Sequence, residues 1–214
     1  MRVQVRIVAG ALRGRKLTCE ISPGLRPTPQ MVREALFSIL GNAVPDRPFY
    51  DVFAGTGVVG LEALSRGAST AEFIERDFRL AQDIDRHLAA FDYADEGRVR
   101  RADAYRWAEH WDAPPESVNV FVSPPFPDLD RRTDDLLALI GALQQKVSPG
   151  SVIVVQSEKG SALDPLPLAE QWEERRYGRN VLWIWVREQP EGPPEANGQK
   201  EREPGGADGD GYRR

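Results

Sequence analysis

The segment from Asp51 to Gly60, with the sequence DVFAGTGVVG, contains the residues with the clearest chemical signature in this 214-residue chain. Gly55, Gly57 and Gly60 follow the spacing G-x-G-x-x-G, which is typical of a strand that turns sharply into a helix. Because glycine has no Cβ and accepts a positive φ, such a turn lets a ligand approach the backbone closely. The spacing predicts a nucleotide-type binding loop that includes Phe53, Gly55 and Gly57.

Acidic residues stand at the ends of three successive predicted strands: Asp51, Glu75 and Asp103. Asp51 would repel a pyrophosphate, but it suits a cationic head such as the amino and sulfonium groups of S-adenosylmethionine. Glu75 is placed to accept ribose hydroxyls, and Asp103 with its neighbour Ala104 is placed to meet an adenine. Singly, each acid could equally be a cap or a surface charge. Their joint placement predicts S-adenosylmethionine as the cofactor.

A fourth predicted strand, 118–122, leads into Ser123-Pro124-Pro125-Phe126. In open α/β sheets the reactive groups lie at the carboxyl ends of the strands. Two prolines remove two amide donors and leave carbonyl acceptors, which could orient the poorly nucleophilic exocyclic amine of a base toward a methyl group. Phe126 could stack on that base. The alternative interpretation is that the two prolines only end a strand.

Strand and helix patterns alternate from about residue 48, which predicts an α/β fold of the Rossmann-like class with a mostly parallel seven-stranded sheet. The last two strands are expected to be antiparallel and to lie at one edge of this sheet. The predicted strands are 49–53, 71–75, 98–101, 118–122, 151–156, 172–177 and 181–187, and the predicted helices are 58–66, 77–91, 105–110 and 133–146.

The first 45 residues are expected to form an extension before the catalytic domain, 46–188. A β-hairpin over 3–8 and 12–18 should precede a helix that begins at Thr28, whose hydroxyl would cap it. Residues 1–40 contain seven basic and two acidic side chains, a balance of +5 in a chain of net charge −5. This asymmetry suggests contact with phosphates, although a solvated basic surface explains it as well. The candidate RNA-binding residues are Arg6, Arg13, Arg15, Lys16, Arg26 and Arg33.

Composition restricts the other classes of protein. Cys19 is the only cysteine and there are two histidines, so no metal site is expected. No apolar run is long enough to span a bilayer and the N-terminus does not resemble a signal peptide, so we expect a cytoplasmic protein. We also expect it to be a monomer. Residues 189–214 are rich in glycine and proline, which predicts a disordered tail.

The chain resembles the RsmD family of 16S ribosomal RNA guanine-N2 methyltransferases. The residues that carry the resemblance are GLRPTP at 24–29, VREALF at 32–37, DVFAGTG at 51–57 and GLEALSRGA at 60–68. The resemblance spans about residues 6 to 187. It implies methyl transfer to the 2-amino group of a guanine in the RNA of the small ribosomal subunit, RNA contact by the basic hairpin, and a target-amine site at 123–126.

Ser123 departs from the resembled family, which usually has Asp at this position, while related amine methyltransferases have Asn. A serine hydroxyl is uncharged and accepts hydrogen bonds more weakly than a carboxylate. Slower catalysis, help from another acid such as Asp128 or Asp130, and a different nucleic-acid amine target are all compatible with this change. Two alternatives of other classes are a non-catalytic RNA-binding protein and a nicotinamide-dependent oxidoreductase, which Asp51 disfavours.

Overall fold

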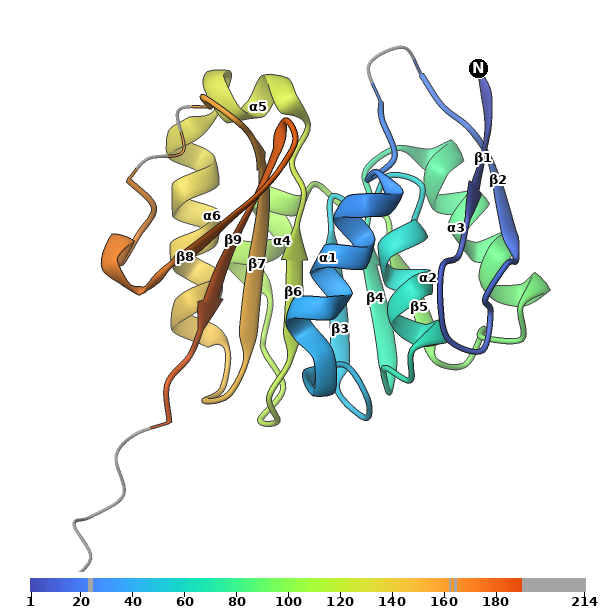
Figure 1. Cartoon of the computed structure of the whole chain (residues 1–214), viewed down its shortest axis with the longest axis horizontal. Helices are drawn as coiled ribbons and strands as arrows, with labels where there is room; N and C mark the ends of the chain where they lie inside the picture. Colours follow the sequence, from blue (N-terminus) through green and yellow to red (C-terminus); the bar gives the residue numbers. More distant parts are fainter. Residues whose placement is uncertain (23–24, 162, 164, 190–214) are drawn as a thin grey trace, which may run out of the picture.

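A computed structural model describes residues 1–22, 25–161, 163 and 165–189, and it places the main sheet at the centre of the molecule (Figure 1). The sheet has seven strands in the order β5-β4-β3-β6-β7-β9-β8. The first five pair in parallel, and β9 and β8 are antiparallel to their neighbours. The predicted fold class is therefore confirmed. Strand bounds are β1 Arg2–Arg6, β2 Lys16–Glu20, β3 Pro48–Val52, β4 Thr70–Ile74, β5 Gly97–Arg100, β6 Asn119–Val122, β7 Val152–Glu158, β8 Glu173–Tyr177 and β9 Asn180–Val186.

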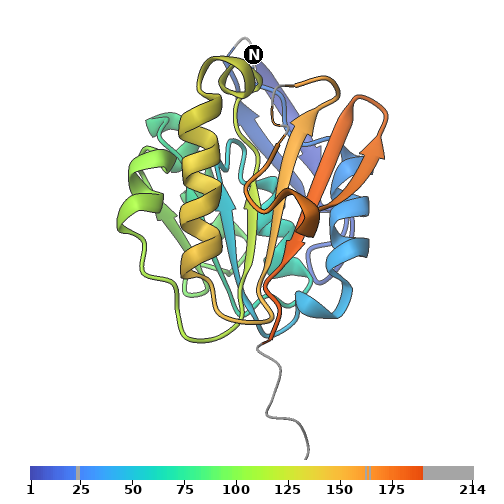
Figure 2. The same cartoon turned by 90° about the vertical axis from the view of Figure 1, so that its left-hand side faces the viewer.

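Helices cover both faces of the sheet (Figure 2). One core contains α1, α2 and α3, and a second core on the other face contains α4, α5 and α6. The helices are α1 Gln30–Leu40, α2 Val58–Ser65, α3 Phe78–Ala90, α4 Ala104–His110, α5 Phe126–Arg131 and α6 Thr133–Lys146, with short 3₁₀ turns at Gly41–Ala43 and Ala169–Gln171.

The central strand β6 shows why the strands read as continuous apolar runs in the sequence. Phe121 packs into the core of α1 to α3, whereas Val120 and Val122 pack into the core of α4 to α6. All four residues of the strand are buried. Successive side chains of a strand point to opposite faces, so a strand covered on both sides is apolar at most positions. Asn119, the polar residue of β6, donates to the carbonyl of Ala43 at 2.6 Å.

The start of α1 differs from its prediction. The helix begins at Gln30, with Pro29 at the N-cap position and no capping side chain. The hydroxyl of Thr28, expected to cap the helix, instead lies 3.5 Å from Oε1 of Gln156. Helix α5 was not predicted at all, because the sequence around Pro125 and Pro127 reads as a loop.

The N-terminal hairpin of β1 and β2 packs along α3 (Figure 1). The amide of Thr18 donates to Nε2 of His87, and Arg15 donates to the carbonyl of Ala90. Leu17 and Cys19 belong to the same buried cluster as α1, α2 and the central strands. Residues 1–45 therefore share a core with the sheet. The predicted tail, 189–214, lies outside the described residues except for Gln189.

Gly60 sets the distance between α2 and β4, and its substitution should be costly. A Cβ added at this position would lie 2.3 Å from Cε1 of Phe73. We expect Gly60→Ala to lower the free energy of unfolding by about 1–3 kcal/mol through overpacking, although alanine favours helix. Gly141 in α6 is the matched control, because its added Cβ would find no atom nearer than 4.0 Å. Gly141→Ala should be neutral or stabilising in urea unfolding, and equal losses in both variants would contradict the packing role of Gly60.

Candidate active site

A cavity of about 530 Å³ opens where the parallel strands end. Six of the seven predicted cofactor residues and all four predicted catalytic residues line it, which brings together segments far apart in the sequence. The main lining segments are Leu25 to Pro29, Asp51 with Phe53 to Thr56, Glu75 to Asp77, Ala102 to Tyr105 and Ser123 to Pro127, together with Gln156, Glu158, Arg179 and Asn180.

The glycine loop between β3 and α2 has three residues with positive φ. They are Phe53 at 63°, Gly55 at 57° and Gly57 at 71°. Gly57, the predicted cofactor residue that does not line the cavity, packs behind the loop, where an added Cβ would lie 2.7 Å from Ile84. A positive φ is a strained conformation for Phe53, because its side chain has a Cβ. Its ring packs edge-on against that of Tyr105, with 5.3 Å between the ring centroids. The backbone of the loop therefore has positive φ angles at positions where glycine is favoured over residues with a Cβ.

Asp51 both caps α2 and faces the cavity. Its Oδ2 accepts a hydrogen bond of 2.9 Å from the amide of Gly60, in the first turn of the helix. The side chain is 1% exposed, and burial raises the pKa of its carboxyl to about 7. A buried carboxylate with a raised pKa is stabilised in its charged form by a cationic partner. The capping role and the predicted role toward a cationic ligand are therefore compatible.

The raised pKa of Asp51 predicts how stability of the ligand-free protein depends on pH. The folded state binds this proton more tightly than the unfolded chain, so the contribution to stability is complete below about pH 4 and is lost as pH rises through about 7. We expect the free energy of unfolding in urea to decrease between pH 5 and pH 8. Asp51→Asn should flatten this decrease, whereas the exposed control Asp130→Asn should not; an unchanged slope in Asp51→Asn would contradict the assignment.

Glu75 is fixed by two backbone amides. Its Oε2 accepts from the amide of Gly55 at 2.7 Å, and its Oε1 accepts from the amide of Asp77 at 2.8 Å. The side chain is buried, and desolvation raises the pKa of its carboxyl despite these bonds. A carboxylate oxygen has two acceptor sites, so each oxygen retains capacity for a further donor. Glu75 thereby joins the glycine loop to the wall of the cavity.

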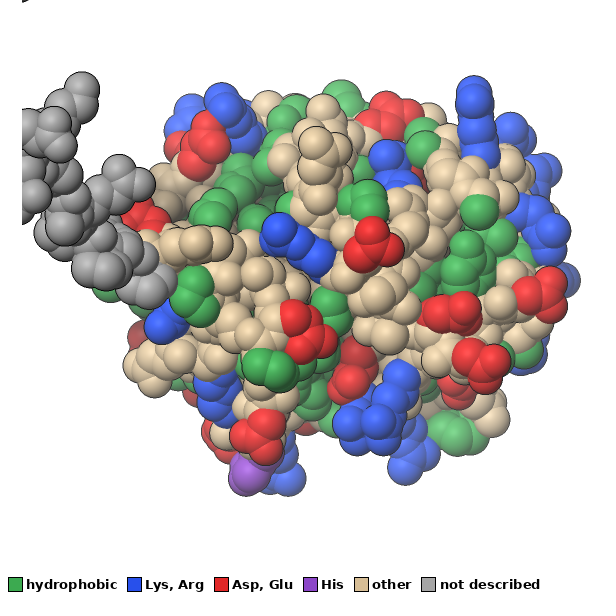
Figure 3. Space-filling view, turned by 90° about the horizontal axis from the view of Figure 1, so that it is seen from below, with side chains coloured by type: hydrophobic (Ala, Val, Ile, Leu, Met, Phe, Trp, Pro, Cys, Tyr) green, Lys and Arg blue, Asp and Glu red, His purple; other side chains and the backbone are tan. Residues whose placement is uncertain are grey.

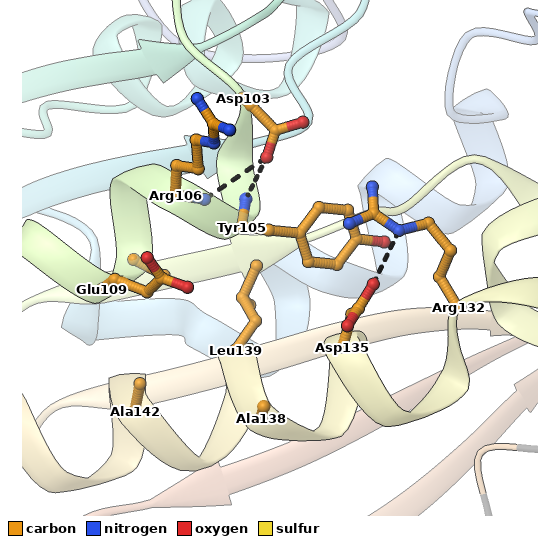
Figure 4. Close-up of a pocket in the computed structure, with 10 residues that line it drawn as sticks. Asp103, Tyr105, Arg106, Glu109, Arg132, Asp135, Ala138, Leu139 and Ala142 are labelled. Atoms are coloured by element: carbon orange, nitrogen blue, oxygen red, sulfur yellow. Dashed lines mark hydrogen bonds and ion pairs between the residues drawn. The ribbon is translucent and has the colours of Figure 1, made fainter.

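Asp103 caps α4, as its alternative interpretation held, and it also lines the cavity (Figure 4). Its Oδ1 accepts from the amides of Tyr105 and Arg106 at 3.0 and 3.3 Å, and the other oxygen points away from these bonds. The cap fixes the carboxylate at the end of β5, beside the backbone of Ala104. The geometry therefore allows both roles at once.

Tyr105 connects this end of the cavity to α5. Its hydroxyl donates to Oδ2 of Asp128 at 2.9 Å. The guanidinium of Arg132 lies 3.7 Å from the centre of its ring (Figure 4). Tyr105 and Arg132 also line a groove of about 600 Å³ between α4 and α6. Asp128 is therefore engaged outside the cavity, and Asp130 is exposed and does not line it. Neither acid lines the cavity with Ser123, so the structure does not support help from Asp128 or Asp130, one of the alternatives left open for Ser123.

Ser123 has a different polar neighbour. Strands β6 and β7 are parallel with Val122 opposite Val155, so position 123 lies beside position 156. The Ser123 hydroxyl donates to Oε1 of Gln156 at 3.2 Å, and Nε2 of Gln156 donates to Oδ1 of Asn180 at 3.0 Å. Sequence reasoning missed Gln156 and Asn180, because only strand register places them here.

Arg33 is a structural residue, and its prediction as an RNA contact is wrong. The side chain is 2% exposed and forms an ion pair of 3.0 Å with the fully buried Glu62. Its other nitrogens donate to the carbonyls of Thr28 and Arg6 at 2.6 and 2.8 Å. Sequence gives the charge of an arginine but not its burial.

The other basic residues fall into two groups. Arg26 lines the cavity, as do Arg76 and Arg179, which were not predicted. Arg6, Arg13, Arg15 and Lys16 are exposed on the hairpin. The hairpin turn bonds to Ser65 and Ala90, at the ends of α2 and α3 that are farthest from the cavity. Since α3 has 13 residues, this cluster is separated from the cavity by about 20 Å of helix.

Figure 3 shows the end of the molecule opposite to the cavity, where the strands begin. Acidic and basic side chains are scattered over this face, and basic ones gather along its upper right edge, the side on which the hairpin lies in Figure 1. An extended polyanion could therefore follow the hairpin, but it does not find a continuous basic surface on this face. Within the described residues, no helix has the length and apolar composition to cross a bilayer.

A parallel sheet with this glycine loop, an acid at each of three strand ends and a Pro-Pro corner after the fourth defines a class I methyltransferase. A solved structure described as a putative methyltransferase, yhhF of Escherichia coli, has 33% identity and a TM-score of 0.74, covering 88% of this chain and all of that one. A Thermus thermophilus 16S rRNA N2 G1207 methyltransferase, solved with AdoMet and guanosine, shares the fold at 18% identity and a TM-score of 0.65, covering 88% of this chain and 50% of that one.

Residues 5–186 match the protein family described as Conserved hypothetical protein 95. The ribosomal RNA small subunit methyltransferase D of Escherichia coli K12 is 35% identical over 195 residues, 91% of this chain and 95% of that protein. The chain belongs to the RsmD family of ribosomal RNA methyltransferases. Membership confirms the predicted resemblance and removes the oxidoreductase alternative.

Proposed function

We propose that this protein transfers a methyl group from S-adenosylmethionine to the exocyclic N2 amine of a guanine in small-subunit (16S) ribosomal RNA. The observation that carries the proposal is that the corner from Ser123 to Phe126 shares one cavity with Asp51, Glu75 and Asp103. The Escherichia coli relative is a small subunit methyltransferase by name, and the Thermus neighbour acts on N2 of a guanine. A monomer that acts in the cytoplasm on ribosomal RNA, or on the assembling small subunit, is part of the same proposal.

The residues of the cavity fit S-adenosylmethionine. Asp51 has a carboxyl whose pKa is raised by burial, which suits a cationic head, and Glu75 and Asp103 each offer acceptor capacity beyond their backbone bonds. Gly55 has no Cβ, and an added one would point into space with no atom nearer than 3.6 Å. Bound there, S-adenosylmethionine would supply the methyl group for transfer to the amine nitrogen, and its sulfur would keep the electron pair of the broken carbon–sulfur bond.

The chain's own contribution is to position the amine. Pro124 and Pro125 lack amide hydrogens, so their segment offers carbonyl oxygens without competing donors. A carbonyl here and Oγ of Ser123 accept the two amine hydrogens, which directs the nitrogen lone pair to one side. Phe126 lies at the cavity wall, where its ring can stack on the base. After transfer the nitrogen releases one proton to water.

RNA is expected to bind over two zones. Arg26, Arg76 and Arg179 lie at the cavity and would contact phosphates next to the target nucleotide. The hairpin residues Arg6, Arg13, Arg15 and Lys16 would contact RNA about 20 Å farther on. A substrate that meets both zones must span about 20 Å, as a folded RNA or a ribonucleoprotein surface does.

Mass mapping of modified guanines tests the proposed function. Small-subunit RNA from a strain that lacks the protein should have lost one N2-methylguanosine, and the purified protein should restore it with S-adenosylmethionine. Free 16S RNA, assembly intermediates and mature subunits, compared as substrates, identify which form is used. An unchanged set of methylated guanines in the deletion strain, or a methylated amine in another RNA, would overturn the assignment.

A further inference from the structure

The position that departs from the family pattern, Ser123, is embedded in a chain of side-chain hydrogen bonds. Asn180 Oδ1 accepts from Nε2 of Gln156 at 3.0 Å, and Gln156 Oε1 accepts from the Ser123 hydroxyl at 3.2 Å. Gln156 is 4% exposed, so it is held between its partners rather than by solvent. Thr28 is a second hydroxyl donor, 3.5 Å from the same Oε1.

The direction of these bonds decides what Ser123 offers to the cavity. A serine hydroxyl has one proton and two acceptor lone pairs, and it rotates to suit its partners. Because Asn180 takes a hydrogen from Gln156 Nε2, Oε1 of the same amide is the atom that faces Ser123. The proton of Ser123 is therefore directed at Gln156, and the oxygen presents its lone pairs elsewhere. Donation by a hydroxyl also strengthens it as an acceptor.

We propose that Gln156 is a positioning residue for methyl transfer: it holds the hydroxyl proton of Ser123, so that Ser123 Oγ acts only as an acceptor for the target amine. This inference rests on the proposed function. Without Gln156 the hydroxyl is free to rotate and to direct its proton at the amine, where two donors would oppose each other. The neutral pair of Ser123 and Gln156 thus presents only acceptor lone pairs to the amine, as a carboxylate does because it has no proton.

The inference explains why a serine can work where an acid is usual. A carboxylate has no proton and accepts in every orientation, whereas a hydroxyl is solely an acceptor toward the amine only when its proton is engaged elsewhere. Two acids nearby, Asp128 and Asp130, lie outside the cavity and cannot engage it. Gln156 lies on β7 beside Ser123, the residue that follows β6, and the pairing of the two strands fixes the distance between the two residues.

A double-mutant cycle on methylation kinetics tests the inference. We expect Ser123→Ala to lower kcat about tenfold to a hundredfold and Gln156→Met about tenfold, with the KM for S-adenosylmethionine within threefold of the wild-type value. The double variant should be no slower than Ser123→Ala, because Gln156 acts only through Ser123. Gln156→Glu retains an acceptor for the hydroxyl and should recover most of the loss of Gln156→Met at pH 8.

Controls separate positioning from folding. Ser157, the next residue of β7, bonds to Trp183 and does not line the cavity, so Ser157→Ala should change kcat less than twofold. Multiplicative losses in the double variant, or failure of Gln156→Glu to recover activity while it binds S-adenosylhomocysteine normally, would overturn the role of Gln156 alone. An inactive wild-type protein that binds S-adenosylhomocysteine would overturn the proposed function and this inference with it.

Discussion

Arg33→Met is expected to lower the free energy of unfolding by roughly 3–5 kcal/mol, the range found when one partner of a buried ion pair is removed. The substitution leaves the fully buried Glu62 without its 3.0 Å partner. It also leaves the carbonyls of Thr28 and Arg6 without donors. Urea unfolding monitored by tryptophan fluorescence measures the loss, and for a chain of this size the melting temperature should fall by about 10 °C.

Arg66 provides the matched control for this prediction. It also pairs with Glu62, at 2.8 Å, but its side chain is 23% exposed, and its guanidinium lies over the ring of Phe37. Arg66→Met should therefore cost less than half as much as Arg33→Met, because water replaces part of what is lost. Equal losses in the two variants, or a loss below about 1 kcal/mol in Arg33→Met, would show that burial of the ion pair does not set the cost of removing Arg33.

The hydrogen bonds of Arg33 also explain how the N-terminal segment contributes to the cavity. One guanidinium joins the end of β1, the loop before α1 and helix α2. Residues Leu25 to Pro29 of that loop form part of the cavity wall. The family segment around Arg26 and Arg33 therefore has two functions: one arginine faces the cavity, and the other fixes the loop that carries it.

The alternation of strands and helices could be read from the sequence because it depends on local periodicity and on apolar strands buried on both faces. Strand β6 was predicted one residue longer than it is, and β5 and α3 within one residue at each end. Helix α5 was missed because prolines at 125 and 127 are turn signals, yet both fall where a helix start tolerates them.

Within the site, the glycine loop and the acids at strand ends were predictable because each follows its own strand in the sequence. The role of Gln156 was not predictable from the sequence, because it depends on the register of β7 against β6 and on Asn180, the first residue of β9. Arg33 was misassigned for a related reason. Charge is a property of the sequence, whereas burial depends on which elements pack around the residue.

Glu75→Gln is expected to weaken binding of S-adenosylhomocysteine at least a hundredfold. The two oxygens of Glu75 accept from different amides, those of Gly55 and Asp77, so the NH₂ group of a glutamine must face one of these donors. The loop around Gly55 is then displaced from the cavity wall. The ribose contact proposed for this carboxylate is lost as well, and hydrogen bonds to charged groups contribute about 1.5–3 kcal/mol each.

Titration calorimetry measures this loss directly, and Glu72→Gln is the matched control. Glu72 lies on the same strand, β4, but pairs with Arg100 at 2.8 Å and does not line the cavity. Its substitution should leave the affinity within twofold of the wild-type value. If Glu75→Gln binds S-adenosylhomocysteine within threefold of wild type, the acids at the strand ends do not hold the cofactor. The proposed methyl transfer would then need a different binding site, because Glu75 is the carboxylate that ties the glycine loop to the cavity.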